Sequence, residues 1–103
     1  MTPAAFRKLA LSMPGAHEEP HFQRTSFRVG KRIFATMQPD GREAMVPVHP
    51  LTRCAELLAS DPAVFVDYGG WTKRLGSLGV RLALVDAKLL EGLVRDAWAR
   101  IAP

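Results

Sequence analysis

The chain has 103 residues, which is the size of one ordinary domain with one modest hydrophobic core. Apolar residues make up 48% of it and charged residues 23%, which excludes a disordered chain or a fibre. No apolar run approaches the roughly 18 residues of a membrane span, and no segment resembles the apolar centre of a signal peptide. The single cysteine, Cys54, excludes an internal disulfide and favours a reducing compartment. We therefore expect a single cytoplasmic domain over residues 1–103.

Residues 2–13 have the pattern of an amphipathic helix. Thr2 is a suitable N-cap, and Pro3 suits the first helical position. The apolar residues that follow are spaced three and four apart, and they are Phe6, Leu9, Ala10 and Met13. Pro14-Gly15 ends this helix.

Residues 25–37 predict a β-hairpin with strands at 26–29 and 32–35. The two-residue turn is Gly30-Lys31, in which glycine can supply a positive φ. In this register Phe27 faces Phe34 and Thr25 faces Thr36, and opposed residues share a face of the sheet. The core face then carries Phe27, Phe34 and Val29. The solvent face carries Arg24, Arg28 and Ile33.

The middle of the chain extends this hairpin to a meander and adds a second helix. A strand at 43–48 follows the turn at Pro39-Asp40-Gly41. Pro50 suits the first turn of a helix that ends at Asp61-Pro62. The apolar stripe expected on this helix consists of Leu51, Cys54, Ala55 and Leu58.

The last third predicts short strands and a final helix. Strands are expected at 63–66 and 81–84, and a weaker one at 72–75. Asp86 caps a helix whose buried face consists of Leu90, Leu93, Val94, Ala97 and Ile101, with Trp98 beside it. The whole order indicates an α+β protein with a mostly antiparallel sheet and N-terminal, middle and C-terminal helices.

Residues His17 to His21 satisfy the H-E-x-x-H pattern of zinc proteases, which requires both histidines on one face of a helix. Pro14-Gly15 has just ended a helix, and Pro20 disfavours helical geometry in the residue before it. We interpret the segment as a surface loop leading into a strand and predict no metal site. Cys54, on the apolar stripe of the second helix, is interpreted as a buried structural thiol.

Two further patterns that would indicate an enzyme are missing. The glycines lack the strand-to-helix setting of a phosphate-binding loop, and no pair of carboxylates is set apart for acid–base chemistry. We therefore expect no catalytic residue, no cofactor and no enzymatic activity.

The distribution of charge is more informative than its sum, which is +4. Residues 20–38 and 68–85 each contain several cations and no acid. These cations are Arg24, Arg28, Lys31 and Arg32 in the first segment and Lys73, Arg74 and Arg81 in the second. Projecting basic hairpins can follow DNA phosphates, and exposed aromatic residues near them can stack on bases. The candidates for stacking are Phe22, Tyr68 and Trp71, and the alternative is a solvated basic face with these aromatic residues in the core.

Several strings of the chain resemble the MmcQ/YjbR family. They are residues 9–15 (LALSMPG), Glu18-Glu19, residues 26–35 (SFRVGKRIFA), Gly70-Trp71 and the closing helix at 88–101. The match covers nearly the whole chain, and the hairpin string is its most specific part. The resemblance implies an α+β fold of the frataxin/CyaY-like kind with two DNA-binding wings, in a family of small, mostly bacterial proteins of unproven role. The chain departs from the family at residues 46–48 and 96–98, so no ligand site is carried over.

Under this resemblance, Arg28, Lys31 and Arg32 belong to the first wing, and Lys73 and Arg74 follow the tryptophan as the second wing would. A frataxin-like iron site is disfavoured, because the first helix carries Arg7 and Lys8 and no acid. The leading hypothesis is a non-enzymatic domain that contacts DNA phosphates through both wings, largely independently of sequence. No membrane is expected among its partners. The alternative is a protein-interaction or small-ligand module that uses the sheet face with Ile33 and Arg28.

Overall fold

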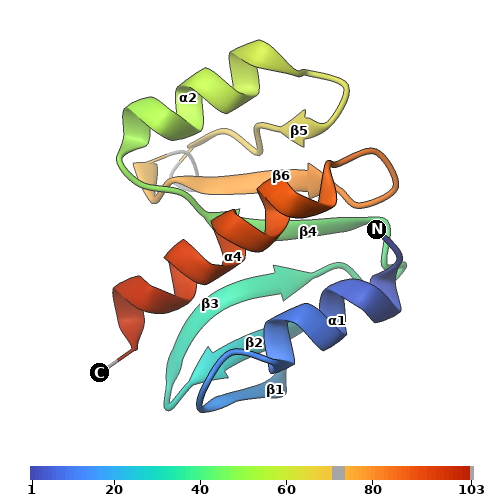
Figure 1. The fold of residues 1–103 in the computed structure, drawn as a ribbon, viewed down its shortest axis with the longest axis vertical. Coiled ribbons are helices and arrows are strands. Elements are labelled where there is room, and N and C mark those ends of the chain that lie inside the picture. Colours follow the sequence, from blue (N-terminus) through green and yellow to red (C-terminus); the bar gives the residue numbers. More distant parts are fainter. Residues whose placement is uncertain (71–73, 103) are drawn as a thin grey trace.

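The computed structural model describes residues 1–70 and 74–102, which form helices around a six-stranded antiparallel sheet (Figure 1). The elements are α1 (Pro3–Leu11), β1 (Ala16–His21), β2 (Arg24–Val29), β3 (Arg32–Met37), β4 (Glu43–Pro47), α2 (Leu51–Ser60), β5 (Phe65–Val66), β6 (Ser77–Arg81) and α4 (Ala87–Ile101). The strand order is β1-β2-β3-β4-β6-β5. This confirms the predicted α+β class with helices at both ends and in the middle.

The helices α1 and α4 lie across one face of the sheet, and α2 lies alongside β5 and β6 (Figure 1). The predicted caps are confirmed: Thr2 accepts a hydrogen bond from the amide of Ala5 at 3.0 Å, and Asp86 accepts one from Leu89 at 3.0 Å. The ring of Phe6 in α1 meets the ring of Phe27 in β2 edge to face, with centroids 5.8 Å apart.

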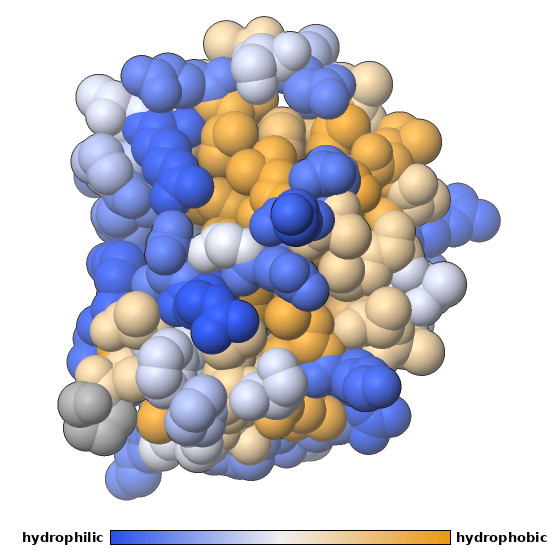
Figure 2. Space-filling model, viewed as in Figure 1, coloured by the Kyte–Doolittle hydropathy of each residue, from blue (hydrophilic) through white to orange (hydrophobic). Residues whose placement is uncertain are grey.

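The core lies between the sheet and these helices. Its largest fully buried apolar side chains are Phe6, Phe27, Phe34, Leu78, Leu82, Leu90, Leu93, Val46, Val80 and Val94. The predicted buried face of the last helix is therefore confirmed at four of its five positions, while Ile101 is half-buried. Apolar surface also gathers between α2 and α4 (Figure 2). Leu57 and Leu58 of α2 and Leu89 of α4 are only partly buried.

The expected hairpin register is right at the turn and wrong beyond it. Arg28 faces Ile33, but a bulge follows, so Phe27 faces Ala35 and Thr25 faces Met37. The bulge makes Phe34 the extra residue of β3, and both Phe34 and Ala35 are buried. The two-residue turn could not reveal this shift, because a bulge is selected by packing against the helices.

Several expected boundaries also move. Residues 17–21 belong to the edge strand β1 and are not a loop; Pro20 is tolerated there because an edge strand needs fewer ladder hydrogen bonds. The strand expected at 81–84 is instead β6 at Ser77–Arg81, since Leu82 to Leu84 form a turn before α4. Half of the weak strand expected at 72–75 lies outside the described residues, and its described half, Arg74 and Leu75, is not a strand.

The stripe expected on the second helix is only partly confirmed. Cys54 is buried and Leu58 packs against the core as predicted, but Leu51 and Ala55 are exposed. Leu57, which was not predicted, also packs against the core. The helix sits at an edge of the sheet, so its buried face is narrow.

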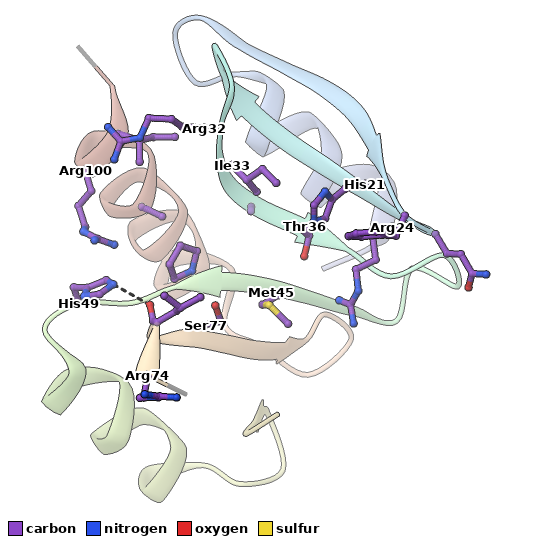
Figure 3. Close-up of a pocket in the computed structure, with 17 residues that line it drawn as sticks. His21, Arg24, Arg32, Ile33, Thr36, Met45, His49, Arg74, Ser77 and Arg100 are labelled. Carbon is purple, nitrogen blue, oxygen red and sulfur yellow. Dashed lines mark hydrogen bonds between the residues drawn. The ribbon is translucent and has the colours of Figure 1, made fainter. Parts of the chain in front are cut away.

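The strands β3 and β4 pair only at Thr36 with Met45 and at Met37 with Ala44. Beyond these pairs the two strands diverge, and the C-terminal half of α4 runs past the opening (Figures 1 and 3). Among residues 1–70 and 74–102, no helix is long and apolar enough to cross a membrane.

Substitutions at two glycines test this packing, because one glycine is closely surrounded by other atoms and the other is not. A Cβ on Gly79 would lie 2.5 Å from Cε2 of Tyr68 and 2.9 Å from Cβ of Val66. We expect Gly79→Ala to lower the free energy of unfolding by about 2 kcal/mol, measured by urea denaturation. Gly92, inside α4, has no atom within 4 Å of such a Cβ, so Gly92→Ala should raise it by about 0.5–1 kcal/mol. Equal effects at both positions would contradict the register of β5 on β6.

Candidate functional site

The divergence of β3 and β4 opens a cleft of about 1150 Å³, which we call the sheet cleft (Figure 3). Most of its apolar lining comes from two strands and one helix, and Phe22 and Leu75 add to it from outside them. The strand and helix residues are Ile33 and Ala35 of β3, Met45 and Pro47 of β4, and Ala97 and Ile101 of α4. The volume is at the upper end for a ligand pocket, and apolar walls with a few polar groups are typical of such pockets.

Four arginines from separate parts of the chain surround this cleft, and we call them the cationic rim. They are Arg24 in β2, Arg32 in β3, Arg74 before β6 and Arg100 in the last turn of α4 (Figure 3). His21 and His49 also line the cleft. No aspartate or glutamate is among the described lining residues, so the local charge is uniformly positive or neutral.

The rim arginines are not neutralised by carboxylates of the described chain. The ion pairs found there join Arg7 to Glu18, His17 to Glu19 and Arg53 to Asp96. None of them includes a rim arginine, although Asp96 lines a small neighbouring pocket with Arg100. An arginine that has no ion partner keeps its full donor capacity for an external anion.

Two buried polar atoms border the cleft without a hydrogen-bond partner among the described residues, Nη1 of Arg24 and Oγ1 of Thr36. Such orphans are rare in native proteins and cost free energy. The guanidinium of Arg24 lies 5.9 Å above the ring of Tyr68, which gives it a cation–π contact in place of a carboxylate.

The structure brings together three of the seven predicted site residues at the cleft, namely Arg24, Arg32 and Arg74. Lys31 lies exposed in the adjacent turn, and Arg28 is half-buried with its Nε donating to Oγ of Ser26 at 2.8 Å. The seventh, Lys73, lies outside the described residues.

Arg81 has a structural role in the described chain. Its Nη1 donates to the carbonyl oxygens of Pro62 at 3.2 Å and Ala63 at 2.9 Å, which holds the loop before β5.

Sequence reasoning missed Arg100, His21 and His49. Arg100 directly precedes the apolar Ile101 at the end of a helix that was considered only for its buried face, and no periodic signal marks it. His49 is held by a hydrogen bond between its Nε2 and the carbonyl of Leu75 at 3.0 Å, a contact between segments distant in sequence.

The two histidines of the H-E-x-x-H string lie on the strand β1 and not on a helix. His17 and His21 are four residues apart on a strand, and Nε2 of His17 pairs with Oε2 of Glu19 at 2.6 Å. That hydrogen bond, more than the nearby Arg28, holds the pKa of Glu19 below its ordinary value. Among the described residues, no three histidines, cysteines or acids are grouped to hold a metal.

Of the two candidate stacking residues that the structure describes, Phe22 is on the surface. It is 94% exposed, borders the cleft and forms the turn between β1 and β2. Tyr68 is half-buried, and Trp71 lies outside the described residues. Phe22 is also the non-glycine residue with a positive φ, 57°, in the described chain, a conformation that a bulky side chain adopts only at a cost.

Tyr68 is held by hydrogen bonds near the turn that joins β3 to β4. Its hydroxyl donates a very short hydrogen bond to Oε1 of Glu43 and accepts a weaker one from Nε2 of Gln38 at 3.4 Å. Burial, followed by the hydrogen bond to Glu43 and its negative charge, raises the pKa of Tyr68 well above its ordinary value.

Comparison with known proteins adds the following. A model of the YjbR family matches residues 11–100. Among solved structures, the crystal structure of Deinococcus radiodurans protein DR2400, with a domain of the DUF419 family model, is similar with a TM-score of 0.83. The alignment covers 97% of this chain and 78% of that one at 24% identity, so it shows the fold alone. No curated protein matches the chain.

The chain has one tyrosine, so its titration can be followed by phenolate absorbance. We expect Tyr68 to ionise clearly above the ordinary pKa of 10.0, and Glu43→Gln should lower the pKa of Tyr68. Because the folded pKa is raised, the stability that Tyr68 contributes is complete below its ordinary pKa and is lost as the pH rises towards the folded value. Glu56→Gln on the exposed side of α2 is the control, and an ordinary pKa in the native chain would contradict the described contact.

The strain at Phe22 is testable by stability. Asparagine tolerates a positive φ better than phenylalanine, and Phe22 is so exposed that its removal sacrifices little buried area. We expect Phe22→Asn to raise the free energy of unfolding by about 1 kcal/mol, measured by urea denaturation. A loss of stability would show that Phe22 contributes to folding.

Proposed function

The chain belongs to the YjbR family, whose function is uncharacterised, and we propose that it binds DNA by placing phosphates on the cationic rim of the sheet cleft. The observation that carries the proposal is the convergence of Arg24, Arg32, Arg74 and Arg100 around one cleft whose described lining contains no acid. Phosphate contacts supply most of the affinity of sequence-independent DNA binding.

The chemistry of the rim suits an anion with two or more oxygens, and phosphate is one such anion. A guanidinium presents a planar fork of donors that matches two phosphate oxygens, and four forks around one opening suit a chain of phosphates. The exposed Lys31 beside Arg32 extends the cationic surface along the β2–β3 turn. The proposal thus keeps Arg24, Lys31 and Arg32 of the predicted first wing and Arg74 of the second, and it adds Arg100.

Three residues predicted from the sequence are not assigned to this cationic surface. Arg28 and Arg81 donate to groups of the protein itself, so neither is assigned a phosphate. Lys73 stays a prediction of the sequence. Binding without catalysis and a cytoplasmic location are also parts of the proposal, the latter resting on the single cysteine.

A second candidate function has a specific observation in its favour. The apolar floor formed by Ile33, Met45 and Ile101 suits a small amphipathic anion with an apolar body and a carboxylate or phosphate head. This candidate corresponds to the small-ligand alternative of the sequence analysis, with the ligand now bound in the cleft. DNA that competes with such a ligand would support a shared site.

The double variant Arg32→Ala/Arg100→Ala tests the proposal. We expect it to weaken binding to labelled DNA about tenfold at about 50 mM salt. The slope of log affinity against log salt should fall by the amount that corresponds to the loss of about two phosphate contacts. Fluorescence anisotropy at about 50–200 mM salt gives both quantities. Both side chains are exposed, so the stability of the variant should change by less than about 1 kcal/mol.

The matched control is Lys8→Ala/Arg95→Ala, which removes the same charge from exposed positions on α1 and α4 that do not line the cleft. The control should lose much less affinity than the rim variant. Equal losses in both variants would show a general effect of net charge, and no binding by the native chain at about 50 mM salt would contradict the proposal itself.

A further inference from the structure

We infer that the sheet cleft accepts an unpaired base and that Phe22 is the surface on which it stacks, so the chain prefers single-stranded DNA to duplex. This inference rests on the proposed function, because the cationic rim supplies the phosphate contacts. It adds a choice between two forms of DNA and a role for one aromatic residue.

The first support is the position of Phe22. Its side chain is 94% exposed at the border of the cleft, whereas large apolar side chains are usually covered by the protein. The ring of His21 lies edge to face against it, with centroids 4.8 Å apart and an interplanar angle of 64°. One side of Phe22 therefore has a neighbouring ring that limits its orientation, and the rest is open for stacking.

The second support is the backbone of Phe22. Its φ of 57° belongs to the left-handed region that glycine, asparagine and aspartate adopt readily. A phenylalanine in that place costs stability and buries almost nothing in return. Neither the turn nor the core accounts for an aromatic residue here, whereas a ligand that stacks on it does.

The third support is the floor of the cleft. Phosphates need cations and water, and they gain nothing from the apolar surfaces of Ile33, Met45 and Ile101. A base that has left its stack presents two apolar faces and suits such a floor. Within a duplex the bases are stacked on one another, so only an unpaired strand can place a base on Phe22 and in the cleft at the same time.

The polar groups of the cleft fit the same occupant. Ser77 and Thr36 line it with hydroxyl groups, and Oγ1 of Thr36 has no partner among the described residues. Hydroxyl groups hydrogen-bond to the edge of any base, as expected for binding with little sequence preference.

The experiment compares a labelled single strand of about 12 nucleotides with its duplex by fluorescence anisotropy at low salt. The native chain should bind the single strand at least about tenfold more tightly. Phe22→Ala should weaken single-strand binding about tenfold and leave duplex binding within about twofold. Phe22→Trp should restore the single-strand affinity, since tryptophan keeps the stacking surface.

The matched control is Leu84→Ala, which truncates another exposed apolar side chain, 59% exposed, that does not line the cleft. It should change neither affinity. Equal native affinity for both forms, or a Phe22→Ala variant that binds the single strand as well as the native chain, would overturn the inference.

Failure of the inference can be told from failure of the proposed function. If Arg32→Ala/Arg100→Ala weakens binding to both forms while Phe22→Ala weakens neither, the rim binds phosphate and the role of Phe22 is wrong. If the native chain binds neither form at low salt, the proposed function fails and the inference fails with it.

Discussion

The short pairing of β3 with β4 is the constraint on which the rest of the structure depends. The two strands share a register only at Thr36–Met45 and Met37–Ala44, next to the turn that joins them. Farther from the turn, the bulge in β3 directs both Phe34 and Ala35 into the core and bends the strand away from β4. The sheet therefore stays continuous at one end and opens at the other, where α4 passes (Figure 3).

This opening explains why the candidate site draws on so many segments. Ile101 and Arg100 reach the cleft because the C-terminal half of α4 passes the opening between β3 and β4, and Arg74 reaches it from the segment before β6. The hydrogen bond between His49 and the carbonyl of Leu75 connects the end of β4 to that same segment. Apolar floor and cationic rim are thus two results of one irregularity in the sheet.

Local chemistry was sufficient to predict the parts of the fold that depend on neighbouring residues. Thr2 with Pro3, Asp86, and the Gly30-Lys31 turn each specify a cap or turn by their own geometry, and all three predictions were confirmed. The bulge beyond Arg28 and the start of β6 at Ser77 were not predicted, because both depend on packing between elements. The same limit applied to the site: Arg24, Arg32 and Arg74 were found as charges in acid-free segments, whereas Arg100 joins them only through the tertiary fold.

We propose that the cationic rim is the anion-binding surface of this chain. Proton–nitrogen NMR of backbone amides and arginine Nε groups, recorded while a short DNA strand is added, shows which residues the DNA contacts. We expect the largest shifts at Arg24, Arg32 and Arg100 and at the amides around Phe22. Shifts concentrated on α1 and α2, with the rim arginines unchanged, would contradict this proposal.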